Sequence, residues 1–155
     1  MEKALDQAKK AFEVQEVPIG AVIIHNGQVI AQAHNLCIAL KNPLAHAEAL
    51  VIQQALLCLN HPYLEGCDLY VTLEPCAYCA GAIALTRIRR LFFGAYDPKG
   101  GGVEHGSRIF DHSLYKPEVY GGVNEGESSL LIKDFFHFKR RCQDKQYFDT
   151  QQHKI

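Results

Sequence analysis

The chain has 155 residues, of which 48% are hydrophobic and 21% are charged, and its formal net charge is −1. A chain of this length predicts one domain over residues 1–155, with enough residues for a full hydrophobic core. The near-neutral charge argues against a general affinity for polyanions, and no run of about 18 apolar residues could span a membrane.

The first half of the chain predicts a helix, a β-hairpin and a second helix. An apolar stripe at helical spacing opens the chain, without the apolar centre of a signal peptide. Asn26-Gly27 lies between two apolar runs, which is a strong signal for a β-hairpin. The run AHAEALVIQQALLCL has good helix formers on several faces, so we expect a largely buried helix. In chain order, we predict a helix over 1–12, strands over 20–25 and 28–34, a loop over 35–44 and a helix over 45–59.

The second half of the chain alternates strands and helices. The β-rich run LYVTL precedes Pro75, and the apolar segment CAYCAGAIAL after this proline is helix-like. Asp97 starts a long glycine-rich loop that we expect to be flexible. The predicted elements are strands over 69–73, 91–95 and 118–121 and helices over 76–85 and 127–147. This alternation favours an α/β fold, a three-layer α/β/α sandwich around a five-stranded mixed sheet.

His46, Cys76 and Cys79 form the most informative pattern in the sequence. The two cysteines lie three residues apart at the start of a predicted helix, so both thiols face one side of its first turn. The positive end of the helix dipole favours thiolate, the form that binds metal. Three protein ligands leave one coordination position open for water, as in a catalytic zinc site. Glu48 follows the histidine closely and could transfer protons in a hydrolytic reaction.

Other uses of a C-x-x-C pair are a redox site and half of a structural zinc site. A redox pair would not require His46 or Glu48. A structural site would need a second pair of ligands, but the remaining cysteines are isolated from one another: Cys37, Cys58, Cys67 and Cys142. We therefore favour a catalytic zinc, and H-x-E followed by P-C-x-x-C is the signature of zinc-dependent nucleobase deaminases. Six cysteines without a regular framework also fit a reducing cytoplasm.

Basic residues are unevenly distributed along the chain. Residues 42–86 contain no Lys or Arg, whereas Lys133, His137 and Arg140 share one face of the last predicted helix. This stripe could track phosphates, but it is more often the solvated side of a terminal helix, which the sequence favours. Three aromatic side chains of the same helix could stack on bases, although we expect two of them in the core: Phe135, Phe136 and Phe138.

The pattern extends well beyond the metal ligands. The segments VPIGAV, AHAEA, LYVTLEPCxxCAGAI, RIRRLFFGAYDPK and FFHFKRR together resemble the family of bacterial tRNA-specific adenosine deaminases, over roughly residues 4–141. The resemblance implies a cytidine-deaminase-like fold, a homodimer with one Zn²⁺ per subunit and a cytoplasmic location. It also implies that the wobble adenosine of a tRNA anticodon loop is converted to inosine.

Carried over position by position, the resemblance also assigns roles to individual residues. These are the zinc ligands His46, Cys76 and Cys79, the proton carrier Glu48, the base contacts Asn35 and the N–H of Ala47, the pocket walls Pro18 and Pro75, and the substrate-backbone contact Asp97. The chain departs from the family in three places. Tyr78 replaces the usual methionine, the loop GGGVEHGSRIF is longer than usual, and the first helix begins a few residues late. None of these removes a chemical group that the reaction needs.

Two other functions share these features. A deaminase of a free base or nucleotide, such as guanine or cytosine, would keep the zinc site but would lack the steep salt dependence of RNA contacts. A catalytically silent RNA-binding subunit is the least favoured, because Glu48 is present.

Overall fold

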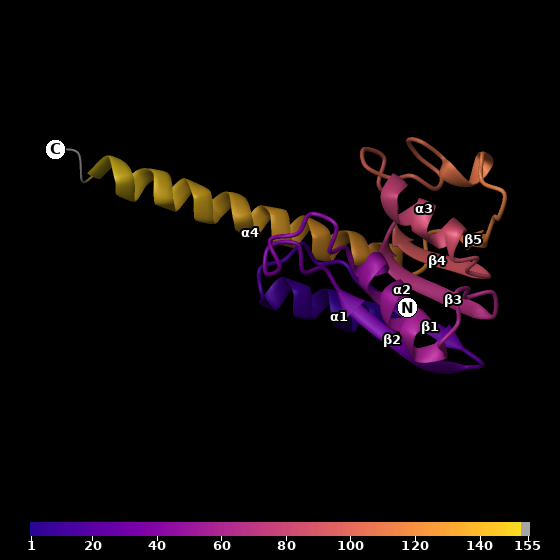
Figure 1. Cartoon of the computed structure of the whole chain (residues 1–155). Coiled ribbons are helices and arrows are strands. Elements are labelled where there is room, and N and C mark those ends of the chain that lie inside the picture. Colours follow the sequence, from indigo (N-terminus) through magenta and orange to yellow (C-terminus); the bar gives the residue numbers. More distant parts are fainter. Residues whose placement is uncertain (153–155) are drawn as a thin grey trace.

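The computed structural model describes the backbone of residues 1–152 and the side chains of residues 1–142. The elements, in chain order, are α1 (Glu2–Glu13), β1 (Gly20–His25), β2 (Gln28–His34), α2 (Ala47–Leu59), β3 (Cys67–Leu73), α3 (Ala77–Leu85), β4 (Arg90–Ala95), the 3₁₀ helix η1 (Ile109–Asp111), β5 (Glu118–Tyr120) and α4 (Glu125–Gln152). The strands form one mixed sheet in the order β2-β1-β3-β4-β5 (Figure 1). This confirms the predicted five-stranded α/β fold.

Helices cover both faces of the sheet. Helix α1 packs on β1 and β2, and α4 packs on β4 and contacts α1, so these two helices form one layer. Helices α2 and α3 form the opposite layer and bury apolar side chains against the sheet. Strands β3 and β4 are buried on both faces, and for this reason they are apolar along most of their length. The side chains beneath α2 and α3 include Ile23, Leu69, Leu91 and Phe93.

Strand direction determines where α2 and α3 begin. Strands β2 and β3 are both antiparallel to β1, so they run in the same direction and end at the same edge of the sheet. Helix α2 follows β2 and helix α3 follows β3, which means that both helices begin at that edge. Helix α3 is the crossover that the parallel pair β3 and β4 requires.

The glycine-rich segment after Asp97 differs from the flexible loop that the sequence predicts. Gly101 forms an isolated β-bridge with Cys76, and the N–H of Ile109 donates to the carbonyl of Gly102 at 2.8 Å. A Cβ atom on Gly102 would lie 2.5 Å from the backbone nitrogen of Ala77. Here glycine allows close backbone contact, so its presence does not indicate mobility.

Helix α4 also differs from its prediction. It ends at Gln152, past the expected end at residue 147, and it extends well away from the rest of the molecule (Figure 1). Of Phe135, Phe136 and Phe138, only Phe135 is buried, packed edge-on against Phe12 of α1, so the expectation that two of these three lie in the core was wrong. Phe136 and Phe138 are 46% and 43% exposed, although the ring of Phe138 also lies 6.3 Å from that of Phe12. No helix among the described residues is long and apolar enough to cross a membrane.

Candidate active site

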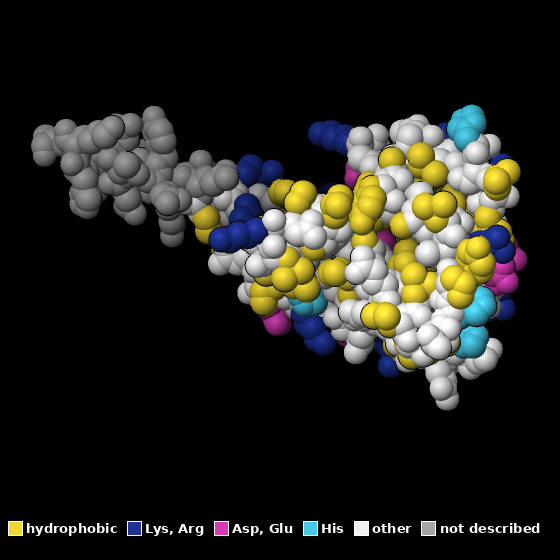
Figure 2. Space-filling model, viewed as in Figure 1, with side chains coloured by type: hydrophobic (Ala, Val, Ile, Leu, Met, Phe, Trp, Pro, Cys, Tyr) yellow, Lys and Arg dark blue, Asp and Glu magenta, His cyan; other side chains and the backbone are white. Residues whose placement is uncertain are grey.

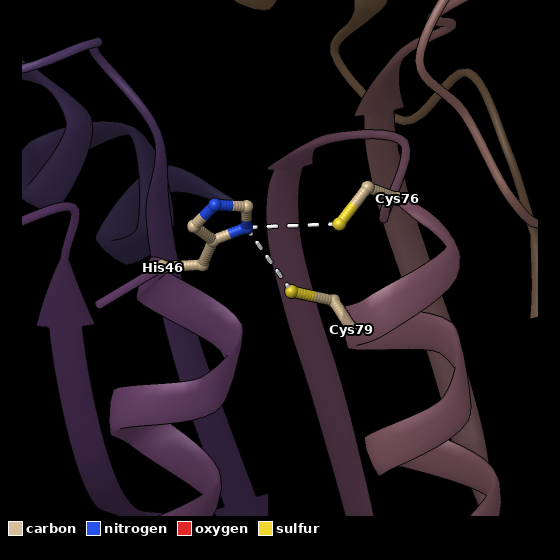
Figure 3. Close-up of side chains that lie close together, drawn as sticks. All are labelled: His46, Cys76 and Cys79. Carbon is tan, nitrogen blue, oxygen red and sulfur yellow. Dashed lines mark hydrogen bonds between the residues drawn. The ribbon is translucent and has the colours of Figure 1, made fainter. Parts of the chain in front are cut away.

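The three predicted metal ligands converge where α2 and α3 begin (Figure 3). His46 is the N-cap residue of α2, Cys76 is the N-cap residue of α3, and Cys79 lies in the first turn of α3. The Nδ1 atom of His46 is 3.6 Å from Sγ of Cys76 and 3.4 Å from Sγ of Cys79. One ligand atom from each residue lies within 4.8 Å of the other two.

These separations fit a zinc ion. Tetrahedral zinc bound to sulfur at about 2.3 Å and to nitrogen at about 2.0–2.1 Å holds the two ligand atoms about 3.5 Å apart. One imidazole and two thiolates are also ligands that zinc prefers. Among the described residues, no other group of three or more His, Cys, Asp or Glu side chains has such geometry.

The two cysteines differ in their protonation. A hydrogen bond from Cys79, supported by one from His46, lowers the pKa of Cys76 to about 4. The same thiol–thiol hydrogen bond, together with burial, raises the pKa of Cys79. This hydrogen bond therefore favours the thiolate on Cys76 and the thiol on Cys79. A bound cation would displace the remaining proton, since thiolate is the form that ligates metal.

Glu48 lies in the first turn of α2, beside the ligand group, and its side chain is buried. Burial raises its pKa to about 7, with the charges of Cys76 and His46 acting on it in opposite directions. Its Oε2 atom is buried and has no hydrogen-bond partner among the described residues. An unpartnered buried polar atom costs about 1–3 kcal/mol, so this arrangement indicates a functional role. A pKa near neutrality suits a group that must both accept and donate a proton.

Asn35 and Ala47, the predicted base contacts, are bonded to each other. The N–H of Ala47 donates to Oδ1 of Asn35 at 2.8 Å, and both residues are buried. A base that accepted from the N–H of Ala47 would therefore compete with Asn35 Oδ1. The predicted wall residues are buried nearby: Pro18 precedes Ile19, whose carbonyl accepts the N–H of Asn35, and Pro75 precedes the ligand Cys76.

Asp97 lies just after β4, and its side chain organises its own loop. Oδ1 of Asp97 accepts hydrogen bonds from the N–H groups of Lys99 and Gly100 at 3.1 and 3.0 Å. The side chain therefore fixes the first turn of the glycine-rich segment. Its predicted contact with the substrate backbone stays a prediction.

Tyr78, the departure between the two cysteines, lies at the rim of the site. Its ring meets the ring of His46 edge-on, with the centroids 5.8 Å apart and an interplanar angle of 83°. Its hydroxyl lies 3.5 Å from the carbonyl oxygen of Leu44, in the loop that precedes α2. The side chain is 42% exposed, so it borders the site without displacing a ligand.

Two buried carboxylates that sequence reasoning missed hold the loops around this site. Oε1 of Glu16 accepts the N–H groups of Ile38 and Ala39, each at 2.8 Å, in the loop between β2 and α2. Glu74 accepts hydrogen bonds from the loop after β4. The sequence feature that could have indicated these buried carboxylates is an acidic residue within or beside an apolar segment, as in LYVTLEP.

The chain resembles known deaminases in sequence. Residues 1–140 match the family model described as MafB19-like deaminase. The chain is 50% identical over 142 residues to the tRNA-specific adenosine deaminase of Agrobacterium fabrum, which covers 90% of this chain and 93% of that protein. It is 46% identical over 143 residues to the tRNA-specific adenosine deaminase of Bacillus subtilis, covering 91% and 89% of the two chains.

Solved structures share the fold. One, from a study of A-to-I editing by tRNA:A34 deaminases at the wobble position of transfer RNA, superposes with a TM-score of 0.83 at 50% identity, over 84% of this chain and 96% of that one. A guanine deaminase from Nitrosomonas europaea gives a TM-score of 0.76 over 86% of this chain and 81% of that one. Its identity is 19%, so it is similar in fold alone.

Proposed function

We infer that this chain, which belongs to the family of tRNA-specific adenosine deaminases, hydrolyses the 6-amino group of the wobble adenosine in a tRNA anticodon loop to give inosine and ammonia. The observation that carries the chemistry is the buried carboxylate of Glu48, whose Oε2 has no partner among the described residues, beside three atoms with zinc-ligand geometry. The choice of substrate is supported by relatives at 50% and 46% identity that are named for it. The enzyme would act in the cytoplasm, where tRNA is modified.

In this proposal, one zinc ion per chain is held by Nδ1 of His46 and by the Sγ atoms of Cys76 and Cys79. The distances between these atoms and the lowered pKa of Cys76, which favours thiolate, support this assignment. When bound, zinc supplies Lewis acidity that lowers the pKa of a coordinated water to about 7. The remaining chemistry belongs to the side chains of the protein.

Glu48 transfers the protons. Its carboxylate accepts a proton from the attacking water and passes it to N1 of the purine, which makes carbon 6 more electrophilic. The resulting hydroxide adds at carbon 6. Glu48 then takes the proton of the new hydroxyl group on carbon 6 and delivers it to the amino nitrogen. The bond between carbon 6 and that nitrogen breaks, ammonia leaves, and carbon 6 keeps the carbonyl oxygen of inosine. Because Oε2 has no partner among the described residues, no existing hydrogen bond must break before the first transfer.

The base is oriented by residues around this centre. Asn35 holds the base through its side-chain amide, Ala47 contributes its N–H, Pro18 and Pro75 form the walls, and Asp97 contacts the RNA backbone. The target base must leave any stack to reach a buried centre, and an anticodon loop presents its bases at little cost. Phe136 and Phe138, exposed on α4, are available to stack on other bases.

A deaminase of free guanine is the main competing function. The similarity to the Nitrosomonas europaea guanine deaminase lies in the fold, at 19% identity. A silent RNA-binding subunit is disfavoured because it would have no use for the buried carboxylate of Glu48.

The test is inosine formation in a short anticodon stem-loop with a wobble adenosine, beside free guanine, cytidine and adenosine as substrates. We expect inosine in the stem-loop alone, with a KM that rises steeply with salt concentration because phosphate contacts release counterions. If a free base or nucleoside is deaminated and the stem-loop is unchanged, the chain is a deaminase but the assignment of tRNA as its substrate is wrong. No turnover of any substrate by a zinc-loaded chain would favour the silent subunit.

The chain also forms a homodimer in this proposal, through the outer surface of α2 and α3. Leu57 on α2 and Leu85 on α3 are 82% and 79% exposed, and Leu114 is fully exposed. Figure 2 shows apolar side chains gathered over this part of the molecule. Exposed apolar side chains on neighbouring elements are typical of a protein–protein interface.

Leu85→Glu should therefore convert the dimer into a monomer, because a charge would be buried in the centre of the contact. Sedimentation of the wild-type chain should give twice the 17.4 kDa mass of one chain, and the variant should give that mass once. Leu130→Glu is the matched control, since Leu130 is 58% exposed on α4, on the other side of the sheet. A wild-type monomer, or a Leu85→Glu dimer, would contradict this interface.

A further inference from the structure

A single buried carboxylate fastens residues 97–109 to the segment that carries the metal ligands. The side chain of Glu74 has no exposed surface, and it lies two residues before Cys76. Its oxygens accept hydrogen bonds from four backbone N–H groups and one imidazole of the loop. The donors are the N–H groups of Asp97 (3.0 Å), Val103 (3.3 Å), Glu104 (2.9 Å) and His105 (2.9 Å), and Nδ1 of His105 (2.8 Å).

The loop backbone is thereby pressed against the start of α3. Gly101 pairs with Cys76 in a β-bridge, and the N–H of Gly102 donates to the carbonyl of Pro75 at 2.8 Å. A Cβ atom on Gly101 would lie 2.6 Å from the carboxyl group of Glu74, so no larger residue fits without displacing the anchor. The loop is therefore a fixed wall on the Cys76 side of the candidate active site.

His105 covers the hydrogen bonds between Glu74 and the loop on their solvent side. Its Nδ1 donates to Oε2 of Glu74, and its ring meets that of Tyr96 edge-on at 5.8 Å. The side chain is 38% exposed, although it is held on two sides. A half-exposed imidazole with one nitrogen committed to a buried carboxylate has its orientation fixed, and the other nitrogen is left for a ligand.

We propose that Glu74 and His105 are positioning residues that hold the 97–109 loop as a preformed contact surface for the nucleotides that flank the target base. This inference rests on the proposed function for the identity of the ligand. A loop that is already ordered saves the entropy cost of ordering on binding, so loss of the anchor should weaken substrate binding more than the chemical step. Neither residue contacts the reacting atoms in this proposal.

The test compares His105→Ala with His112→Ala, a control outside residues 97–109 whose side chain is exposed. We expect His105→Ala to raise the KM for the stem-loop about tenfold, with kcat within about threefold, as for loss of one charge-assisted hydrogen bond. Zinc content should stay at one per chain, and His112→Ala should match the wild type. A fall in kcat at unchanged KM, a loss of zinc, or wild-type kinetics in His105→Ala would overturn the proposal.

Amide hydrogen exchange tests the anchor without any substrate. Glu74→Gln keeps the shape of the side chain but places an NH₂ group against the N–H of Asp97 and the ring of His105. We expect the amides of residues 103–105 to exchange at least about tenfold faster in this variant, because local opening becomes easier. Equal exchange rates would refute the anchor, and His105→Ala provides the same comparison if Glu74→Gln does not fold.

The two proposals can fail separately. If the wild-type chain forms no inosine in the stem-loop, the proposed function is wrong, and so is the assignment of flanking nucleotides as the ligand. The anchoring role of Glu74 and His105 is then decided by amide hydrogen exchange alone. If the wild type is active and the KM of His105→Ala is unchanged, the proposed function stands and the positioning role is wrong.

Discussion

Glu48→Gln is expected to abolish almost all turnover while the zinc remains bound. The amide has the size of the carboxylate but cannot carry a proton, and general acid–base catalysis contributes about 10²–10⁴-fold to rate. The thermal midpoint should be unchanged or higher, because a neutral side chain costs less free energy to bury than a charged carboxylate. The measurements are single-turnover inosine formation in the stem-loop, zinc content by elemental analysis, and thermal unfolding.

Glu127→Gln is the control for this prediction. Glu127 is a half-exposed carboxylate on α4 whose partner is Lys9, so its loss should leave turnover and zinc content as they are in the wild type. If zinc leaves Glu48→Gln together with activity, Glu48 ligates or supports the metal. If Glu48→Gln turns over at the wild-type rate, the proton carrier is another group.

Cys79→Ala should remove both zinc and activity and leave a folded chain. It takes away one of three protein ligands, so we expect zinc affinity to fall by more than about a hundredfold, beyond the loss seen for residues that only support a ligand. The chain should stay folded, because its hydrophobic core is formed by other side chains of the sheet and helices. Circular dichroism and zinc titration with a chromogenic chelator measure the two effects.

The matched control is Cys67→Ala, which removes another buried cysteine, on β3 in the core. Both substitutions delete one sulfur from the interior, so the loss of packing is similar, while only Cys79 belongs to the ligand group. Full zinc occupancy in Cys79→Ala, or equal loss of zinc in both variants, would contradict the assigned site.

The elements and the ligand group could be predicted from the sequence because their signals are local. Asn26-Gly27 marks its own turn, and the cysteine spacing sets which side of α3 both thiols face. The anchors could not be predicted, because Glu74 binds residues 23 to 31 positions away, and only the folded sheet brings such partners together.

Surface charge shows the same difference between local and long-range information. In the sequence, the basic residues that follow residue 86 have no evident acidic partners. In the structure, Arg89 and Arg90 both bind the carboxylate of Asp68, 21 and 22 positions away, because β3 and β4 lie side by side. On α4, by contrast, Lys133, His137 and Arg140 are exposed, as expected for the solvated side of a terminal helix.

The loops around the site have an inner backbone that is bonded to the buried carboxylates of Glu16 and Glu74, and outer turns that are not. Each carboxylate accepts backbone hydrogen bonds from its loop close to the metal-binding helices. The outer turns can therefore change in length or composition while the inner backbone keeps its conformation. Such a layout makes the outer turns modular. Grafting turns from other deaminases between the residues bonded to these carboxylates is therefore a direct way to alter which nucleic acid the site accepts, with the ligands and Glu48 left in place.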